Sequence, residues 1–212
     1  EKGAYDMVMQ GYGGVMSITG CPDGEPVRVG YSVADLAAGL YGAIAITGAL
    51  HARDRLQKGQ YLDVAMLDCQ ISLMENAIAR YFATGKIPVP LGNRHASIAP
   101  FQSFKSTTGY FTVTASTDEQ FANLCDTVGL PELKKDGRFL TKASRAQHAD
   151  DIGTILGRVL EKMPKEHWID RLEKLGVPCG PVNNVKEVVE CPQVQSREMI
   201  IELDHPKAGK IK

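Results

Sequence analysis

The most regular pattern of apolar and polar positions lies between Val33 and about Gln57. Apolar residues recur there at intervals of three and four, which is typical of a helix with one buried face. The apolar stripe comprises Val33, Leu36, Ala37, Leu40, Tyr41 and Ile44. The opposite face begins with Asp35 and continues with small residues only, namely Ala38, Gly39, Gly42 and Ala49. The pattern predicts a helix that is packed along the stripe and open beside Asp35, with room for a bulky acyl group.

Most of the other residues up to 85 are also expected to be helical. Residues from Tyr5 to about Ser17 mix apolar positions with three glycines, which predicts a weak helix broken near those glycines. The long helix is expected to end at Gly59. Residues 60–65 resemble a short strand, and 66–83 return to a helical spacing.

The segment 86–96 contains two prolines and no periodicity, so we interpret it as a linker. Two strands are expected beyond it, at 101–104 and 110–115, followed by helices at about 118–128, 143–162 and 165–175. These elements predict a small α+β domain over residues 97–190. The remaining residues, 191–212, are expected to form a return linker that contains a strand at 199–203. A rigid turn is expected at 178–181 and a short helix at 185–189.

Composition excludes several classes of function. A net charge of -1 argues against a nucleic-acid-binding surface or a basic membrane anchor. We found no run of about 18 apolar residues, so we expect no membrane span. The first residues lack the charged and apolar regions of a signal peptide, and we therefore expect a cytoplasmic location.

The cysteines and histidines give no metal-binding pattern. Five cysteines are an odd number without a Cys-x-x-Cys pair, so neither a disulfide framework nor a zinc site is predicted. The five histidines are scattered without His-x-x-x-His spacing. We expect reduced thiols and no metal.

Asp35 has two compatible interpretations. Ser32 and Asp35 have the spacing of a capping box, in which the two side chains bond to free amides at the helix start. The helix dipole at that position also favours an ionised carboxylate, which is the form that attacks an electrophile.

Several short stretches in a fixed order make the sequence similar to a known family. They are Tyr-Asp-x-x-x-Gln (5–10), Ser-Ile-Thr-Gly (17–20), Pro-Val-Arg-Val-Gly (26–30), the Asp35 helix, Lys-Gly-Gln-Tyr-Leu-Asp-Val-Ala-Met-Leu-Asp (58–68), Gly-Asn-Arg-His-Ala-Ser-Ile-Ala-Pro-Phe-Gln (92–102), Gly-Val-Pro-Cys-Gly-Pro-Val (176–182) and Gln-Val-Gln-Ser-Arg-Glu-Met (193–199). Over essentially its whole length, the chain resembles the family III CoA-transferases. These include formyl-CoA and carnitine CoA-transferases and the 2-methylacyl-CoA racemases.

The resemblance implies an α/β fold in which residues 1–85 are part of a Rossmann-like large domain, mostly helical in this stretch. Members of the family are about twice as long as this chain, with the large domain built from both chain ends and the small α+β domain inserted. They form interlocked homodimers. By that comparison the parallel sheet and most residues that grip the CoA nucleotide lie outside this chain.

The resemblance also implies a chemistry. The aspartate that matches Asp35 is the family's nucleophile, and coenzyme A enters as acyl-CoA, with small carboxylic acids as partners. The residues that we expect to bind substrate or CoA are Tyr5, Gly39, Met66, Asn93, Arg94 and His95. The residues alone leave alternatives for Tyr5, Arg94 and His95: a packed aromatic at a helix start, a surface ion pair and a locally bonded loop histidine. Some relatives close over the aspartate with consecutive glycines, which this chain lacks.

Three hypotheses follow. The first is a CoA-transferase that uses Asp35, the second is a 2-methylacyl-CoA racemase, and the third is a non-catalytic fragment in which Asp35 is only a cap. The racemase branch carries a His-Asp dipeptide thirty positions before its aspartate, where this chain has Tyr5 and Asp6. Racemisation needs a second group that exchanges protons near neutral pH, and an imidazole does so, whereas a phenol ionises only near pH ~10. The missing histidine favours the transferase.

Overall fold

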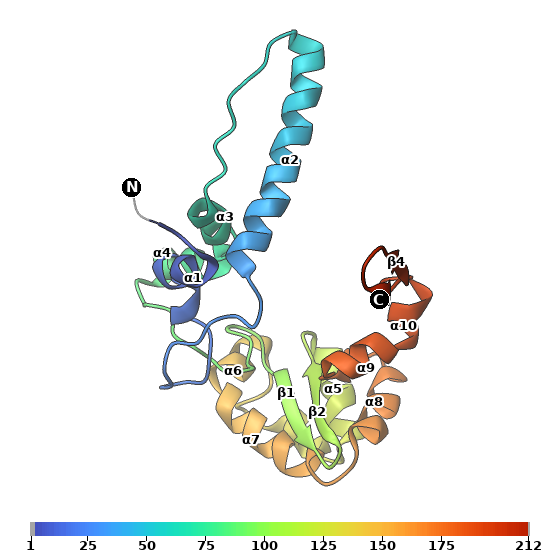
Figure 1. The fold of residues 1–212 in the computed structure, drawn as a ribbon. Coiled ribbons are helices and arrows are strands. Elements are labelled where there is room, and N and C mark those ends of the chain that lie inside the picture. The colour runs from blue at the N-terminus through green and yellow to red at the C-terminus, as the bar shows by residue number, and fades with distance from the viewer. Residues whose placement is uncertain (1–2, 212) are drawn as a thin grey trace. The chain divides into compact units, whose positions relative to one another are not determined.

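The computed structural model describes residues 3–211 and divides the chain into two compact units (Figure 1). The first unit ends at Asn93 and the second begins at Arg94, inside the proline-containing segment 86–96. Helices and strands are mixed, with far more helix than strand, as the expected α/β class requires.

The regular elements among the described residues of the first unit are all helices. Its elements are α1 (Asp6–Tyr12), a 3₁₀ turn (Val15–Ser17), α2 (Val33–Leu56), α3 (Met66–Ser72) and α4 (Glu75–Thr84). Both α1 and α3 pack against α2 and against each other. In Figure 1 the second half of α2 extends away from these two helices. The long helix and the weak, interrupted helix before it were both predicted.

The apolar stripe of α2 is not packed in the way that its spacing indicated. Only Val33, Ala34 and Ala37 are buried on this helix. The exposed fractions of Leu36, Leu40 and Ile44 are 56%, 68% and 67%. Our prediction of a helix packed along the whole stripe is therefore wrong for the residues that the structure describes, because α1 and α3 bury only the first turns.

The expectation of no membrane span stays a prediction, because one helix has the length and composition of such a span. Helix α2 has 24 residues, a mean hydropathy of 1.6 over its most apolar window, and 17% of that window buried. By length and composition alone it is able to cross a bilayer. A single helix of this kind is weak evidence for a span, because the core helices of soluble domains have the same properties.

Three further boundaries in this unit differ from the prediction. Residues 60–65 are not a strand, since a strand needs a partner and none lies among the described residues of this unit. The helix at 66–83 is broken at Leu73 and Met74. Helix α2 ends at Leu56. Its cap residue Gln57 adopts a left-handed conformation with φ of 53°, two residues before the glycine that we expected to end the helix.

The second unit is built on a three-stranded antiparallel sheet. Its strands are β1 (Phe101–Ser106), β2 (Gly109–Thr114) and β3 (Cys179–Pro181), in the order β1-β2-β3. Its helices are α5 (Asp118–Thr127), α6 (Lys142–Gln147), α7 (Ala149–Leu160) and α8 (Lys165–Glu173), with a 3₁₀ turn at Pro131–Lys135. Phe111 and Val113 of β2 are fully buried in a continuous apolar core with residues of α5, α7 and α8. This arrangement has the α+β character predicted from the sequence.

Three features of this unit differ from the prediction. The segment expected to be a turn at 178–181 pairs with β2, because Gly180 lies opposite Thr112 in the register. The helix predicted at 143–162 is divided at His148, which ends α6 and precedes α7. Pro164 lies at the cap position of α8, one residue before the first helical position we expected for it.

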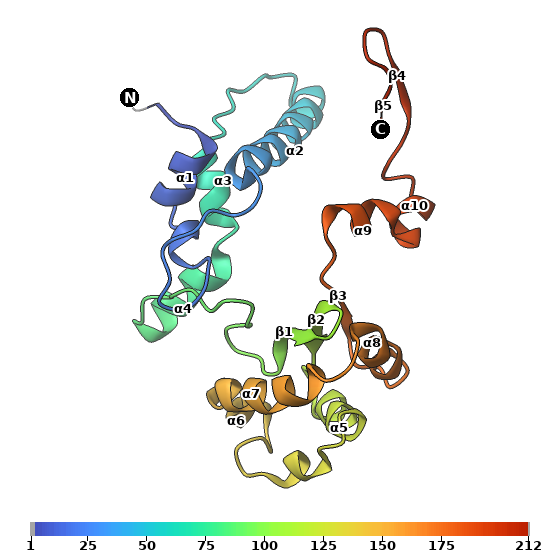
Figure 2. The ribbon, with the colours of Figure 1, turned by 60° about the horizontal axis from the view of Figure 1, so that its bottom comes forward.

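Towards the chain end, α9 (Val185–Glu190) and α10 (Pro192–Ser196) precede a hairpin of β4 (Leu203–His205) and β5 (Gly209–Ile211) (Figure 2). The expected strand at 199–203 is therefore wrong, apart from its last residue. Met199 to Glu202 have no strand partner. Pairing begins at Leu203, and residues 206–208 form the turn between the two paired strands.

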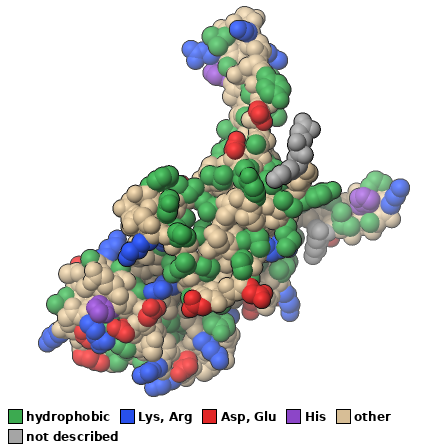
Figure 3. Space-filling model, turned by 90° about the vertical axis from the view of Figure 1, so that its left-hand side faces the viewer, with side chains coloured by type: hydrophobic (Ala, Val, Ile, Leu, Met, Phe, Trp, Pro, Cys, Tyr) green, Lys and Arg blue, Asp and Glu red, His purple; other side chains and the backbone are tan. Residues whose placement is uncertain are grey.

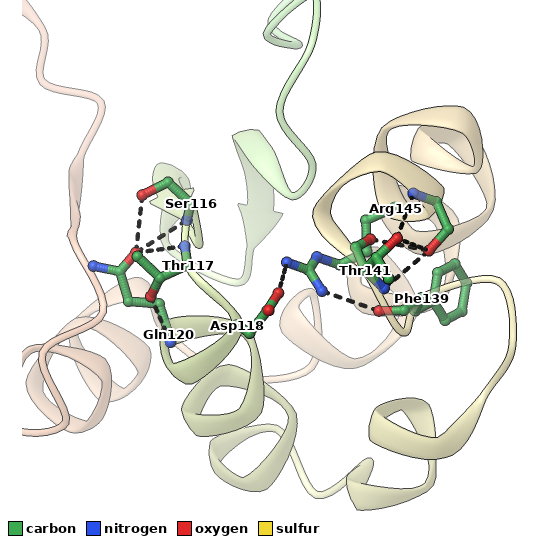
Figure 4. A network of polar contacts seen from close by, with 8 residues as sticks. Ser116, Thr117, Asp118, Gln120, Phe139, Thr141 and Arg145 are labelled. Atoms are coloured by element: carbon green, nitrogen blue, oxygen red, sulfur yellow. Dashed lines mark hydrogen bonds and ion pairs between the residues drawn. The ribbon is translucent and has the colours of Figure 1, made fainter.

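A buried arginine joins two helix starts of the second unit (Figure 4). The Arg145 side chain is 1% exposed, and it donates to the Asp118 carboxylate at 2.6 Å and to the Phe139 carbonyl at 3.0 Å. Its guanidinium lies 4.6 Å from the centre of the Phe121 ring. Helices α5 and α6 begin with capping boxes at Thr117 and Thr141 on either side of this contact.

We predict that Arg145→Ala lowers the free energy of unfolding of the second unit by about 2 kcal/mol, because a buried side chain with three contacts is lost. Chemical denaturation followed by the fluorescence of Trp168, the single tryptophan of the chain, measures this loss. The control is Arg138→Ala, whose guanidinium also bonds an aspartate, at 2.7 Å, but at an exposed position. That change should hardly move the denaturation midpoint. Equal effects of the two changes would contradict the role given to burial.

Candidate active site at the start of helix α2

Two buried side chains of α1 hold the start of α2. Asp6 Oδ1 accepts a hydrogen bond from the Ala34 amide at 2.9 Å, and Asp6 Oδ2 accepts one from Gln10 Nε2 at 2.7 Å. Gln10 Oε1 accepts from the Val29 amide at 2.8 Å, while its Nε2 also donates to the Tyr31 carbonyl at 3.4 Å. Helix α1 therefore holds both the segment that leads into α2 and the first turn of α2. We call Asp6 and Gln10 the α1 clamp.

The capping box predicted between Ser32 and Asp35 is not formed. Ser32 occupies the cap position, but its side chain makes no cap hydrogen bond. The free amide of Ala34 is instead satisfied by Asp6, which lies 28 positions earlier in the chain. A carboxylate at a helix start is favoured by the helix dipole, and here Asp6 takes this role.

Asp35 is consequently available for chemistry. It lies in the first turn of α2 and is exposed. Within residues 3–211 its carboxylate has no hydrogen bond or ion pair, as expected for a group that must meet a substrate. A methyl group added to Gly39 or Gly42 would meet no atom within 4 Å. The face beside Asp35 is therefore open in the described structure.

The apolar side of the same helix forms a groove of about 390 Å³. Its lining residues are Tyr31, Val33, Leu36, Ala37, Leu40, Tyr41, Ile44 and Leu73. Figure 3 shows apolar side chains gathered on the face below the protruding end of α2, whose tip carries basic side chains. An exposed apolar surface of this kind is typical of a site that contacts another molecule or further protein.

Four other expected site residues belong to the first unit. Tyr5 occupies the cap position of α1, directly before Asp6, and is 82% exposed, so it is not an aromatic packed in the core. Gly39 follows Asp35 by one helical turn on α2. Met66 is the first residue of α3 and is partly buried. Asn93 is the last residue of this unit, next to Gly92, whose amide donates to the Gly20 carbonyl at 2.9 Å.

Arg94 and His95 belong to the second unit and have local partners. Arg94 forms an ion pair with Asp150 at 3.1 Å, in which the Asp150 side chain is 87% exposed. His95 Nδ1 accepts from the Ser97 amide at 3.1 Å, and its ring stacks on Phe101 with the centroids 4.9 Å apart. These contacts orient both side chains, and their role in binding stays a prediction.

Two cysteines, the buried Cys125 and the partly buried Cys179, are poor alternative nucleophiles. Burial, with a smaller contribution from Asp126, raises the pKa of the Cys125 thiol to about 12. Burial, with a smaller contribution from Glu173, raises the pKa of the Cys179 thiol to about 11. Both thiols are therefore protonated near neutral pH, and only the thiolate is strongly nucleophilic. Over residues 3–211 no cluster of three histidine, cysteine or acidic residues has the geometry of a metal site.

Sequence reasoning missed the function of the α1 clamp. Asp6 and Gln10 are four positions apart on a short helix, a spacing that places them on the same face. This spacing could have been used to predict that the two side chains lie side by side. The sequence did not reveal that this face meets the amides of Val29 and Ala34, since these contacts span 19 and 28 positions.

Comparisons with known proteins agree with one another. The model of CoA-transferase family III matches residues 1–212. The chain is 40% identical to acetyl-CoA:oxalate CoA-transferase from Acetobacter aceti, over 93% of this chain and 51% of that protein. It is 36% identical to human succinyl-CoA:glutarate CoA-transferase, over 100% of this chain and 48% of that protein. The crystal structure of a CAIB/BAIF family protein from Brucella suis superposes with a TM-score of 0.80 at 36% identity, covering 100% of this chain and 58% of that one.

The chain thus spans about half the length of the curated relatives that it matches.

Proposed function

The chain belongs to CoA-transferase family III, and from this premise we propose that the complete protein moves CoA from an acyl-CoA donor to a small carboxylic acid through a thioester on Asp35. The observation that carries this proposal is the exposed Asp35 carboxylate, which is left without a partner because Asp6 caps the helix. Asp35 is the catalytic residue.

The reaction needs no water and conserves the thioester energy. The Asp35 carboxylate attacks the carbonyl carbon of the donor thioester, and the C–S bond breaks to give a mixed anhydride and CoA thiolate. The thiolate then attacks the Asp35 carbonyl, and the donor acid leaves as its carboxylate. An acceptor carboxylate attacks the resulting aspartyl-CoA thioester, and the same two steps run in reverse to release the new acyl-CoA and free Asp35.

The other expected site residues have assigned roles in this proposal. Gly39 leaves space for the acyl group beside Asp35, since no atom lies within 4 Å of where a side chain would begin. Arg94 pairs with the acceptor carboxylate through its planar fork. Its contact with Asp150 is an exposed ion pair, which costs little to exchange. Tyr5, Met66 and Asn93 of the first unit, and His95 of the second, are assigned to binding the substrate or CoA.

The names of the relatives favour a short dicarboxylic acid as one partner. Two of them act, by name, on oxalate and on glutarate. A CoA-transferase of this type requires coenzyme A only as its co-substrate, and the mechanism above involves no metal. The relatives named above are transferases, which also favours transfer over racemisation.

We predict that Asp35→Asn and Asp35→Ala lower the transfer rate by at least about 10⁴-fold, because neither side chain forms the acyl anhydride. Intact mass after incubation of the complete protein with acyl-CoA should show a CoA adduct on the wild type, mapped to the Asp35 peptide, and none on the variants. The control is Glu75→Gln, which removes another exposed first-turn acid, on α4. Normal activity in both Asp35 variants would support the non-catalytic alternative.

A second prediction separates transferase from racemase. The complete protein should not exchange the α-proton of a 2-methylacyl-CoA for deuterium, since Tyr5 stands where the racemases have their histidine. NMR of such a substrate in heavy water, with the enzyme at micromolar concentration, measures this exchange. Rapid deuteration with inversion, and no transfer to any added acid, would establish the racemase alternative.

A third prediction concerns assembly. We propose an interlocked homodimer of the complete protein, in which the apolar stripe of α2 is covered by the rest of the polypeptide. Exposed fractions above 50% for Leu36, Leu40 and Ile44 support the need for such a cover. Sedimentation should give the mass of a dimer, and a compact monomer would contradict the proposal.

A further inference from the structure

We propose that the α1 clamp is a positioning device for the nucleophile: Asp6, held by Gln10, sets the direction of the first turn of α2 and thereby the approach of Asp35 to the thioester. This inference rests on the function proposed above. Asp6 and Gln10 are positioning residues, not catalytic ones, because both oxygens of Asp6 are already engaged in hydrogen bonds.

The clamp is buried and connected at every polar atom. Asp6 is 9% exposed and Gln10 is fully buried. One oxygen of Asp6 bonds the Ala34 amide, directly before Asp35, and the other bonds Gln10. Gln10 in turn bonds the backbone of Val29 and Tyr31. A buried network in which each member has its partners favours a single arrangement, which is what a nucleophile held at a fixed angle requires.

Few other contacts fix the beginning of α2 within the described unit. Only three residues of the helix are buried, and two of them, Val33 and Ala34, lie in the same turn as the clamp. The Ser32 side chain contributes no cap bond. Loss of the Asp6 contact would therefore allow the first turn to rotate or fray, and Asp35 would move with it.

The role of the α1 clamp can be tested by exchanging the carboxylate at position 6 with the amide at position 10. In Asp6→Asn the remaining oxygen still accepts from Ala34, but the new NH₂ group faces Gln10 Nε2, so that two donors meet. Turning the Gln10 amide over would only move the conflict to the Val29 amide. The double change Asp6→Asn with Gln10→Glu removes the conflict. The new carboxylate at position 10 then accepts from both the new NH₂ group and Val29. The cost is the long bond to Tyr31, whose carbonyl oxygen then faces a carboxylate oxygen instead of a donor.

The measurement is the rate of CoA adduct formation on Asp35 in a single turnover of the complete protein, over a range of acyl-CoA concentrations. We expect Asp6→Asn to lower the rate at saturating acyl-CoA by about 100-fold per folded molecule, with little change in the half-saturating concentration. The double variant should recover to within about 10-fold of the wild type. Gln70→Met is the packing control, since Gln70 is another buried glutamine and its amide has no partner in the described chain.

The outcomes are distinct. Wild-type protein that forms no adduct would overturn the proposed function and this inference with it. A wild type that forms the adduct, together with an Asp6→Asn variant that melts earlier but reacts equally fast per folded molecule, would overturn the inference alone. A double variant as slow as the single one would also overturn it. If Asp6→Asn does not fold, Gln10→Met serves instead. It keeps the bond from Ala34 to Asp6 and should slow the saturated rate about 10-fold, and an unchanged rate would overturn the inference.

Discussion

The hydrogen bond from the Ala34 amide to the Asp6 carboxylate is the contact on which the candidate site depends. The start of a helix has free amides, and a nearby acid usually satisfies them. If Asp35 bonded free amides at the helix start, its oxygens would be occupied and its approach to a thioester would be blocked. Asp6 belongs to α1 and bonds the free Ala34 amide at the start of α2. Bonding this amide and the proposed chemistry are therefore assigned to different residues. Ser32, at the cap position of the same helix, makes no side-chain cap bond.

Asp6 and Asp35 both lie at the start of α2, but their different surroundings give them different roles. Asp6 is buried and bonded at both oxygens, whereas Asp35 is exposed and has no partner among the described residues. Both benefit from the helix dipole, which favours negative charge at this end. Burial and hydrogen bonding turn Asp6 into a fixed part of the structure. Exposure, with small residues beside it, leaves Asp35 able to reach a substrate.

The parts of the fold that sequence could predict are those set by neighbours in the chain. The period of three to four residues located α2 almost to the residue, and alternation located β1 and β2. Strand β3 was missed because three residues carry no pattern, and only its pairing with β2 makes them a strand. The clamp was missed for the same reason, since its bonds join residues 19 to 28 positions apart. The exposure of the α2 stripe was missed as well, because the spacing of apolar residues does not show which elements pack on them.

The distribution of buried residues shows why activity should be sought in the complete protein. The continuous apolar core lies entirely in the second unit, where Phe111, Leu156 and Leu172 are fully buried. In the first unit the buried apolar residues are few and mostly small: Val33, Ala34, Ala37, Cys69 and Ala77. Small side chains bury little surface, and the free energy of packing scales with that surface. Within the described residues, the unit that carries Asp35 therefore gains less free energy from packing than the second unit does. This difference supports testing the proposed activity in the complete protein.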